Sequence, residues 1–189
     1  MNRAPHLELA KWYWARHLAP GDIAIDATCG NGYDTLFLAK TGSFLFSLDI
    51  QKAAVEKTKD LLSKNLKKEE RKRVILCCLS HEDLRKLPCP EAPRLIVYNL
   101  GYLPGGDKRL TTKTETTLAS VASALSILGK QGAISITCYP GHGEGRKEEE
   151  AILGLATSLP DCEWEVRHHR WINRPLSPSL LWIARFTHS

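Results

Sequence analysis

The sequence predicts an α/β fold in which a mostly parallel sheet is covered by helices on both faces. Short apolar runs that suit buried strands alternate along the chain with segments whose apolar residues recur at helical spacing. This alternation is typical of parallel strands joined by crossover helices. Near the C-terminal end, two β-like runs at 164–171 and 180–186 flank a proline-containing loop, which predicts a terminal antiparallel pair.

The first predicted element is a helix over 4–18. Its apolar residues Leu7, Ala10, Trp14 and Leu18 share one face, and the Ala-Pro-Gly-Asp segment at 19–22 ends it. The elements that follow are a strand at 23–25, a helix at 33–40, a strand at 44–48, a helix at 51–65, strands at 74–79 and 95–98, a helix at 114–128, a strand at 133–139 and a helix at 147–159.

The helix at 114–128 has the clearest apolar stripe of the chain. The members of this stripe are Leu118, Val121, Ala122, Leu125 and Leu128. Two glycines, Gly129 and Gly132, follow the stripe and end the helix. We expect this helix to pack its stripe against the sheet.

Length and composition indicate one globular domain. A chain of 189 residues with 43% hydrophobic residues can bury a continuous core, so we expect a single domain over 1–189, with the helix in 1–20 packed near the functional site. No apolar run reaches the roughly 18 residues of a membrane span, and the N-terminal segment lacks the apolar core of a signal peptide. We therefore expect a cytoplasmic protein without a membrane partner.

The cysteines and the net charge exclude few classes of function. None of the six cysteines forms a C-x-x-C pair or a zinc-like spacing, which predicts reduced thiols and no metal site. The formal net charge of +5 is compatible with a polyanionic partner and is also common in proteins without one.

A glycine-rich turn lies between the first strand of the sheet and the helix after it, in the motif DATCGNGYDT at 26–35. Gly30 and Gly32 permit a tight turn and close approach of a ligand to the backbone. This position is the ligand edge of a doubly wound sheet. A carboxylate at the strand tip, that of Asp26, suits the ammonium group of an amino-acid ligand better than a pyrophosphate.

A second acidic residue, Asp49, ends the next strand, 17 residues after Gly32. An acidic side chain at this place can accept hydrogen bonds from both hydroxyls of a ribose. Either carboxylate alone is more often a solvated strand end, but the pair around a Gly-x-Gly turn predicts a nucleoside cofactor. Thr35 replaces the third glycine of the G-x-G-x-x-G pattern, which disfavours a nicotinamide dinucleotide.

The segment SHED at 80–83 follows the third strand and has two interpretations. Ser80, His81 and Glu82 can border an adenine ring. Alternatively, Ser80 caps a helix whose first turn is acidic. The residues alone do not decide between them.

The fourth strand ends in the loop NLGYLPGGDK at 99–108, which has a polar residue at the strand tip. This loop resembles the Asn/Asp-Pro-Pro-Tyr segment of methyltransferases that modify amino groups on bases. By that resemblance Asn99 accepts a hydrogen bond from the target amine and Tyr102 stacks on the base. Leu100-Gly101 departs from Pro-Pro, and a plain Gly-Gly-Asp turn is the alternative.

Five segments, DATCGNGYDT, SLDIQ, SHEDL, NLGYLPGGDK and YPGHGEG, occur in one order over nearly the whole chain. Together they resemble the YtqB-like (MnmM-like) family of small bacterial proteins labelled rRNA methylases. The resemblance implies a Rossmann-like class I methyltransferase fold, with a seven-stranded sheet of order 3-2-1-4-5-7-6. It also implies S-adenosyl-L-methionine as cofactor and N-methylation of the aminomethyl group of 5-aminomethyl-2-thiouridine at the tRNA wobble position.

The candidate site residues gather at the predicted ligand edge. The expected cofactor contacts are Asp26, Cys29, Gly30, Asn31, Gly32, Asp34, Thr35, Asp49, Gln51, Ser80, His81, Glu82 and Asn99. The expected catalytic residues are Asn99, Tyr102, Asp107 and His142. Asn99 can orient an amine but cannot accept its proton, so the proton acceptor is Asp107, His142 or water.

An RNA substrate, such as a tRNA anticodon stem-loop, requires basic residues beside the site. The expected RNA contacts are Arg3, Lys11, Arg16, Lys108, Arg170 and Arg174. The denser basic run at 64–73 precedes the third strand, on the side away from the site, and we expect it to be solvated. Trp14 is expected in the core, and Trp171 and Trp182 suit either the core or an interface of a monomer or homodimer.

Other functions remain open at this stage. The same cofactor pocket is compatible with methylation of an rRNA base or of a small-molecule amine. A nicotinamide-dependent oxidoreductase is disfavoured by Thr35, and a non-catalytic RNA-binding module is disfavoured by the complete set of glycine and acidic residues at the ligand edge.

Overall fold

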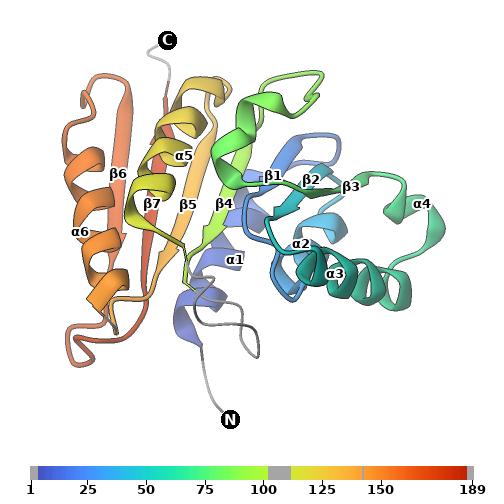
Figure 1. The fold of residues 1–189 in the computed structure, drawn as a ribbon. Coiled ribbons are helices and arrows are strands. Elements are labelled where there is room, and N and C mark those ends of the chain that lie inside the picture. Colours follow the sequence, from blue (N-terminus) through green and yellow to red (C-terminus); the bar gives the residue numbers. More distant parts are fainter. Residues whose placement is uncertain (1–3, 102–111, 142, 187–189) are drawn as a thin grey trace.

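The computed structural model describes residues 4–101, 112–141 and 143–186. Within these residues seven strands form one sheet in the order β3-β2-β1-β4-β5-β7-β6, which confirms the predicted order (Figure 1). The strands are β1 (Ile23–Asp26), β2 (Phe44–Asp49), β3 (Val74–Cys78), β4 (Leu95–Asn99), β5 (Ala133–Cys138), β6 (Trp164–His169) and β7 (Ser179–Arg185).

Within the described residues six strands run in the same direction, and β7 alone is reversed. β1 pairs in parallel with β2 and with β4, and parallel pairs also join β2 to β3 and β4 to β5. β7 is antiparallel to both β5 and β6, as expected for the terminal pair. The carboxyl ends of β1, β2 and β4 therefore lie along one edge of the sheet, where the candidate residues were predicted to meet.

Helices cover both faces of the sheet (Figure 1). They are α1 (Pro5–His17), α2 (Tyr33–Lys40), α3 (Lys52–Asn65), α4 (Lys68–Arg71), a 3-10 helix η1 (His81–Lys86), α5 (Thr114–Ile127) and α6 (Gly143–Thr157). Buried residues of α1, α2 and α3 belong to one hydrophobic cluster, and those of η1, α5 and α6 belong to the other.

The central strands supply side chains to both clusters in alternation. In β1, Ile23 and Ile25 pack in the cluster of α5 and α6, whereas Ala24 packs in the cluster of α1. β4 alternates in the same way. This period of two explains why the strands read as continuous apolar runs, because parallel strands are buried on both faces.

The buried stripe of α5 differs from the predicted one. Ala122 is exposed, and the fully buried positions include Thr117 and Ser120. Both hydroxyls have partners, since Ser120 Oγ donates to the His81 carbonyl at 2.7 Å and Thr117 Oγ1 donates to Glu148 at 2.6 Å. Hydrogen-bonded hydroxyls can enter a core that apolar periodicity alone assigns to larger side chains.

Other helices also differ from the expectation. α6 begins at Gly143, four residues before the predicted start, because its first turn is polar and is held by a hydrogen bond from Thr114 Oγ1 to Glu144 of 3.0 Å. The short helix α4 was not predicted, since it is too short to show helical periodicity, and η1 corresponds to one of the two interpretations of residues 80–83.

The six cysteines are all free, in agreement with the prediction of reduced thiols. No helix within the described ranges is both long and apolar enough to cross a bilayer.

Candidate functional site

The turn between β1 and α2 depends on two glycines in left-handed conformations. Gly30 has φ of 53° and Gly32 has φ of 83°, values that side chains other than glycine rarely adopt. A Cβ atom on Gly32 would lie 2.9 Å from the Cα of Thr58 in α3. The Thr58 hydroxyl donates to the Gly30 carbonyl at 3.3 Å, so α3 holds the turn in place.

Asp26 lies beneath this turn and is 1% exposed. Its Oδ1 accepts from the Thr28 amide at 3.2 Å, and its Oδ2 accepts from the Thr35 hydroxyl at 2.6 Å. Burial, reinforced by the charge of Asp34, raises the pKa of Asp26 to about 7. Thr35 is itself fully buried and bonds to Ser47 at 2.9 Å, so these two candidate residues support the turn from its inner side.

Asp49 connects the end of β2 to the same turn. Its Oδ2 accepts from the Gly30 amide at 3.0 Å and its Oδ1 accepts from the Gln51 amide at 2.9 Å. The side chain is only half-buried. A carboxylate has about four acceptor positions, so two remain for an external donor such as a ribose diol.

Asp34, in the first turn of α2, joins Asn99 at the tip of β4. The Asn99 Nδ2 donates to Asp34 Oδ2 at 3.0 Å, and Lys11 Nζ of α1 lies 3.8 Å from Asp34 Oδ1. The backbone amide of Asn99 donates to Thr28 Oγ1 at 2.8 Å, which fixes the tip of β4 against the glycine turn. Because the amide nitrogen of Asn99 is engaged by Asp34, its amide oxygen is directed the other way.

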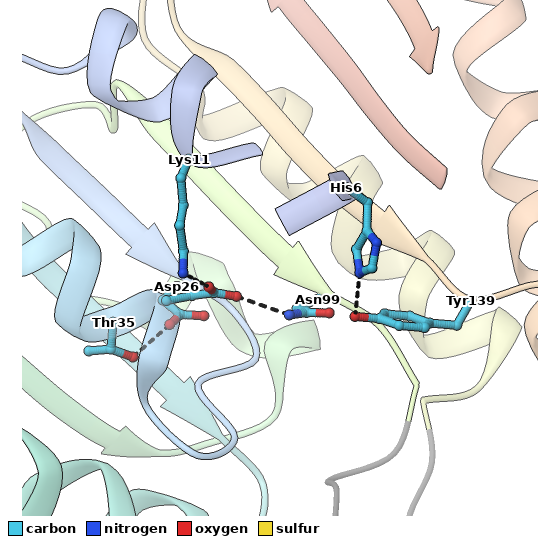
Figure 2. Close-up of polar contacts among 7 residues, drawn as sticks. His6, Lys11, Asp26, Thr35, Asn99 and Tyr139 are labelled. Carbon is cyan, nitrogen blue, oxygen red and sulfur yellow. Dashed lines mark hydrogen bonds and ion pairs between the residues drawn. The ribbon is translucent and has the colours of Figure 1, made fainter. Parts of the chain in front are cut away.

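Tyr139, the first residue after β5, lies on that other side. Figure 2 shows the oxygen of Asn99 facing the hydroxyl of Tyr139, which in turn faces His6 of α1. The Tyr139 hydroxyl and His6 Nε2 are 3.5 Å apart. Burial and the charge of Asp34 raise the pKa of Tyr139 to about 12, against a hydrogen bond with Asn99 that lowers it. Burial lowers the pKa of His6, so a protonated phenol meets a neutral imidazole at pH 7.

Neither His6 nor Tyr139 was predicted as a site residue. Tyr139 follows a strand that ends at the ligand edge, and this position is a signal that sequence reasoning overlooked. His6 carries no such signal, since its contact spans 133 positions of the chain.

Ser80 acts as a helix cap. Its Oγ accepts from the Glu82 amide at 3.3 Å at the start of η1, which is the capping interpretation of this segment. Glu82 is exposed and His81 is half-buried. Burial lowers the pKa of His81. The capping bond does not prevent these residues from lining a ligand.

The other candidates differ in position and burial. Cys29 is buried below the turn, where burial raises its thiol pKa to about 12, and Asn31 and Gln51 are half-buried. Arg16 is exposed and its guanidinium lies 4.3 Å from the ring centre of Trp12. The next residue, His17, bonds to the Arg94 carbonyl just before β4, so Arg16 lies toward the amino ends of the strands. Trp14 and Trp182 are buried, 2% and 3% exposed.

Several predicted residues lie outside the described residues. They are Arg3, Tyr102, Asp107, Lys108 and His142. The ends of the loop after β4 are nevertheless defined, because Gly101 and Thr112 are paired through two hydrogen bonds, from the Gly101 amide to Thr112 Oγ1 at 3.0 Å and from the Thr112 amide to the Gly101 carbonyl at 3.1 Å. Thr112 Oγ1 also donates to the buried Glu148 of α6 at 3.1 Å.

The sheet order and the acidic, glycine-rich ligand edge define a class I methyltransferase fold of the Rossmann-like type. Residues 45–185 match the sequence model of a family described as "Putative rRNA methylase". The chain therefore belongs to this family of rRNA-methylase-like proteins, as the sequence motifs predicted.

Similar proteins occur in plants and bacteria. The chain is 37% identical to an Arabidopsis thaliana protein named tRNA (mnm(5)s(2)U34)-methyltransferase, chloroplastic, over 97% of this chain and 70% of the relative. It matches the structure of a "putative rRNA-methylase" from Clostridium thermocellum with a TM-score of 0.90 and 29% identity, over 98% of this chain and 100% of the other. A "putative methyltransferase" from Streptococcus mutans, solved in complex with SAH, matches with a TM-score of 0.84 and 30% identity, over 98% and 99% of the two chains.

The first prediction concerns the glycine turn. Gly32→Ala introduces a Cβ into contact with Thr58 at a positive φ, so we expect the free energy of unfolding to fall by more than about 1 kcal/mol. Gly154→Ala in α6 is the matched control, since no heavy atom lies within 4 Å of its added Cβ and a helix interior favours alanine. Urea denaturation of both variants checks this, and equal stabilities would contradict the packing argument.

The second prediction concerns Asp26. Its folded-state pKa, about 7, lies above the ordinary value of 3.8, so its ionisation destabilises the folded protein progressively as pH rises from about 4 to about 7. Asp26→Asn removes this charge. The stability of the variant relative to wild type should therefore increase across that pH range, by a few kcal/mol in total, and level off above it. Urea denaturation at a series of pH values measures the difference, and a pH-independent difference would refute a raised pKa.

Proposed function

We propose that the protein is an S-adenosyl-L-methionine-dependent N-methyltransferase that acts on tRNA, at the aminomethyl group of 5-aminomethyl-2-thiouridine in the wobble position. The observation that carries this proposal is Asn99, whose amide oxygen is oriented by Asp34 at the ligand edge, next to the glycine turn. The plant relative named for activity at U34 of tRNA supports the substrate.

The charges at the ligand edge fit this cofactor. Asp26, Asp34 and Asp49 lie close enough together for the charges of the other two to raise the pKa of Asp26. S-adenosyl-L-methionine carries a sulfonium and an ammonium group against one carboxylate, and is therefore a net cation. We infer that Asp49 holds the ribose, that Gly30 and Gly32 let the methionine part approach the backbone, and that the acidic set attracts its positive charges.

When bound, the cofactor supplies a methyl group activated by the sulfonium. The residues of the chain need to hold the amine nitrogen in line with that methyl group, since positioning accounts for much of the rate of such a displacement. The Asn99 oxygen can accept a hydrogen bond from the amine N–H. The Tyr139 hydroxyl, which stays protonated at neutral pH, holds that oxygen in place.

The amine must lose a proton before it attacks. An alkyl ammonium entering this edge meets the carboxylate of Asp34, whose side chain is 11% exposed. We infer that Asp34 binds the ammonium form electrostatically and that the proton then leaves to Asp107, His142 or water. The nitrogen keeps the electron pair that forms the new N–C bond, and the S–C bond breaks to give a neutral thioether.

Several basic residues of the chain suit RNA phosphates. Lys11 is partly engaged by Asp34, whereas Arg16, Arg170 and Arg174 are exposed. Together with Arg3 and Lys108 we propose them as contacts to an anticodon stem-loop. We also propose a single domain in which α1 forms part of the site, present as a monomer or homodimer. A cytoplasmic location stays a prediction, because the plant relative is named chloroplastic.

The test is transfer of label from S-adenosyl-L-methionine, isotopically labelled in its methyl group, to unmodified total RNA, followed by size fractionation and mass spectrometry of the labelled nucleoside. We expect label in tRNA on an aminomethyluridine. Label in rRNA would keep the methyltransferase and replace the substrate, as the family description suggests. Cofactor binding without any labelled RNA would exclude RNA and point to a small-molecule amine.

The third prediction separates binding from turnover. Asp49→Ala removes the proposed ribose acceptor, so we expect the Kd for S-adenosyl-L-methionine to rise roughly tenfold or more. Asn99→Ala should leave that Kd near the wild-type value and lower kcat by roughly 100-fold. Calorimetry and single-turnover kinetics measure the two effects.

Asp60→Ala is the control for Asp49, because Asp60 is an exposed carboxylate of α3. Similar losses of cofactor affinity in the Asp49 and Asn99 variants would refute this division of roles.

A further inference from the structure

A cavity of about 260 Å³ lies beside the candidate site, between the start of α1 and the loop that joins β6 to β7. Its lining residues are Ala4, Pro5, His6, Trp171, Arg174, Ser177 and Pro178. Ligand pockets for whole drug-sized molecules span roughly 300–1,000 Å³, so this cavity suits a smaller group such as one heterocyclic ring system.

The cavity offers an aromatic wall. Trp171 is half-buried, and its ring meets that of His6 edge to face with centroids 6.4 Å apart. Among the described residues no other ring stacks on Trp171. An indole without a stacking partner is a suitable surface for a flat base.

The loop around the cavity is basic. Residues 170–178, which join β6 to β7, include two arginines, Arg170 and Arg174, and contain no acidic residue. Arg167 is paired with Glu165 at 2.7 Å, but the exposed Arg174 forms no ion pair with any described residue. A free guanidinium next to an unstacked indole matches the phosphate and base of a nucleotide.

The loop is already folded by its own hydrogen bonds. The Arg174 amide donates to the Trp171 carbonyl at 2.9 Å, and the amide and hydroxyl of Ser177 donate to the Arg174 carbonyl at 3.0 and 2.8 Å. Pro175 and Pro178 further limit the backbone. A pre-formed loop loses little conformational entropy when a ligand binds.

His6 connects the cavity to the candidate catalytic centre. Its ring contacts Trp171 on one side and Tyr139 on the other, at a centroid distance of 5.7 Å, and the Tyr139 hydroxyl faces the Asn99 oxygen (Figure 2). A base in the cavity is therefore separated from the position of the target amine by two side chains. This arrangement suits the base adjacent to the target nucleotide in an unpaired stretch of RNA.

We propose that this cavity binds an unpaired nucleobase next to the target nucleotide, with Trp171 stacking on the base and Arg174 contacting its phosphate. The inference rests on the proposed action on RNA. Two exposed apolar residues of the same loop, Ile172 and Leu176, are 98% and 59% exposed and indicate a contact surface. RNA is favoured over a second copy of the chain, because a two-fold interface through this loop would bring its arginines together.

The experiment measures binding of a fluorescent 17-nucleotide anticodon stem-loop hairpin with aminomethyluridine at the target position. Single loop nucleotides are replaced in turn by abasic sites. The variants are Trp171→Ala, Trp171→Phe and Arg174→Ala. Matched controls are Phe44→Ala and Arg71→Ala, since Phe44 is a half-exposed aromatic at the start of β2 and Arg71 is an exposed arginine of α4.

We expect Trp171→Ala to weaken binding of the intact hairpin roughly tenfold, Trp171→Phe to restore most of it, and the controls to match wild type. At one loop position, the abasic site should lower the affinity of the wild type by a similar factor and should not lower the affinity of Trp171→Ala any further. That position identifies the stacked base. Arg174→Ala should reduce the salt dependence of binding by about one phosphate contact.

The proposal would be overturned if Trp171→Ala bound the hairpin as tightly as wild type. It would also be overturned if, at every abasic position, the losses of affinity from the substitution and from the abasic site were independent of each other. A dimer in sedimentation that Trp171→Ala converts to monomers would overturn it as well, since the loop would then join two copies. The methyl transfer assay on the same hairpin separates the two hypotheses. If methyl transfer is normal but the effects of Trp171→Ala and of the abasic positions on binding are independent, only the cavity proposal is refuted. If binding depends on Trp171 and on one base but no methyl group is transferred, only the proposed reaction is refuted. If the wild type does not bind the hairpin, both are wrong.

Discussion

Three carboxylates lie at one edge of the sheet, and their mutual repulsion sets the conditions for the rest of the site. Each of the six oxygens of Asp26, Asp34 and Asp49 has a partner from within the chain. Four partners are hydrogen-bond donors of the glycine turn or its neighbours, and the other two are the Asn99 amide and the Lys11 ammonium. Like charges in a partly buried place are costly. The glycine turn and α1 are therefore required to hold these charges as well as to form a ligand site.

The helix α1 combines core packing with contacts to the ligand edge, and its apolar pattern did not specify those contacts. On its core side, Ala10 and Trp14 pack with α2 and the central strands, and Tyr13 stacks on Trp182 of β7 at 4.7 Å. His6 in its first turn and Lys11 at its middle reach Tyr139 and Asp34. The same helix thus closes one hydrophobic cluster and positions polar groups at the ligand edge. A change in its packing is expected to reach the site through these two contacts.

The sequence predicted the sheet more completely than the site. Strand positions followed from apolar runs buried on both faces, and the family resemblance supplied the strand order. The predictions failed where polar groups replace apolar ones, as at the buried Ser120 of α5 and the polar first turn of α6. Hydrogen bonds compensate burial in both places, and their partners come from η1 and the start of α5.

At the site, the residues that follow strands could be predicted, and the pairing between them could not. Asp49 and Asn99 are recognisable because each ends a strand at the ligand edge. The bond between Asn99 and Asp34 joins positions 65 residues apart, and that between Tyr139 and His6 joins positions 133 apart. Such contacts depend on how α1 and α2 pack across the sheet, and a single sequence contains no local pattern for them.

The acidic edge also discriminates between cofactors that the same sheet can bind. In a dinucleotide site, the helix N-terminus after the first strand faces a pyrophosphate and favours its negative charge. Here that helix has Asp34 in its first turn, near Asp26 and Asp49, and among the described residues Lys11 is the one cation that forms an ion pair with these carboxylates. A pyrophosphate at this place would meet two to three negative charges at short range, whereas a sulfonium and an ammonium would neutralise them. Binding of a cation should also lower the raised pKa of Asp26 and release a proton, so the affinity for such a cofactor increases as pH rises toward 7. The charges of this edge thus favour S-adenosyl-L-methionine over a dinucleotide, independently of the presence of Thr35 at the third glycine position.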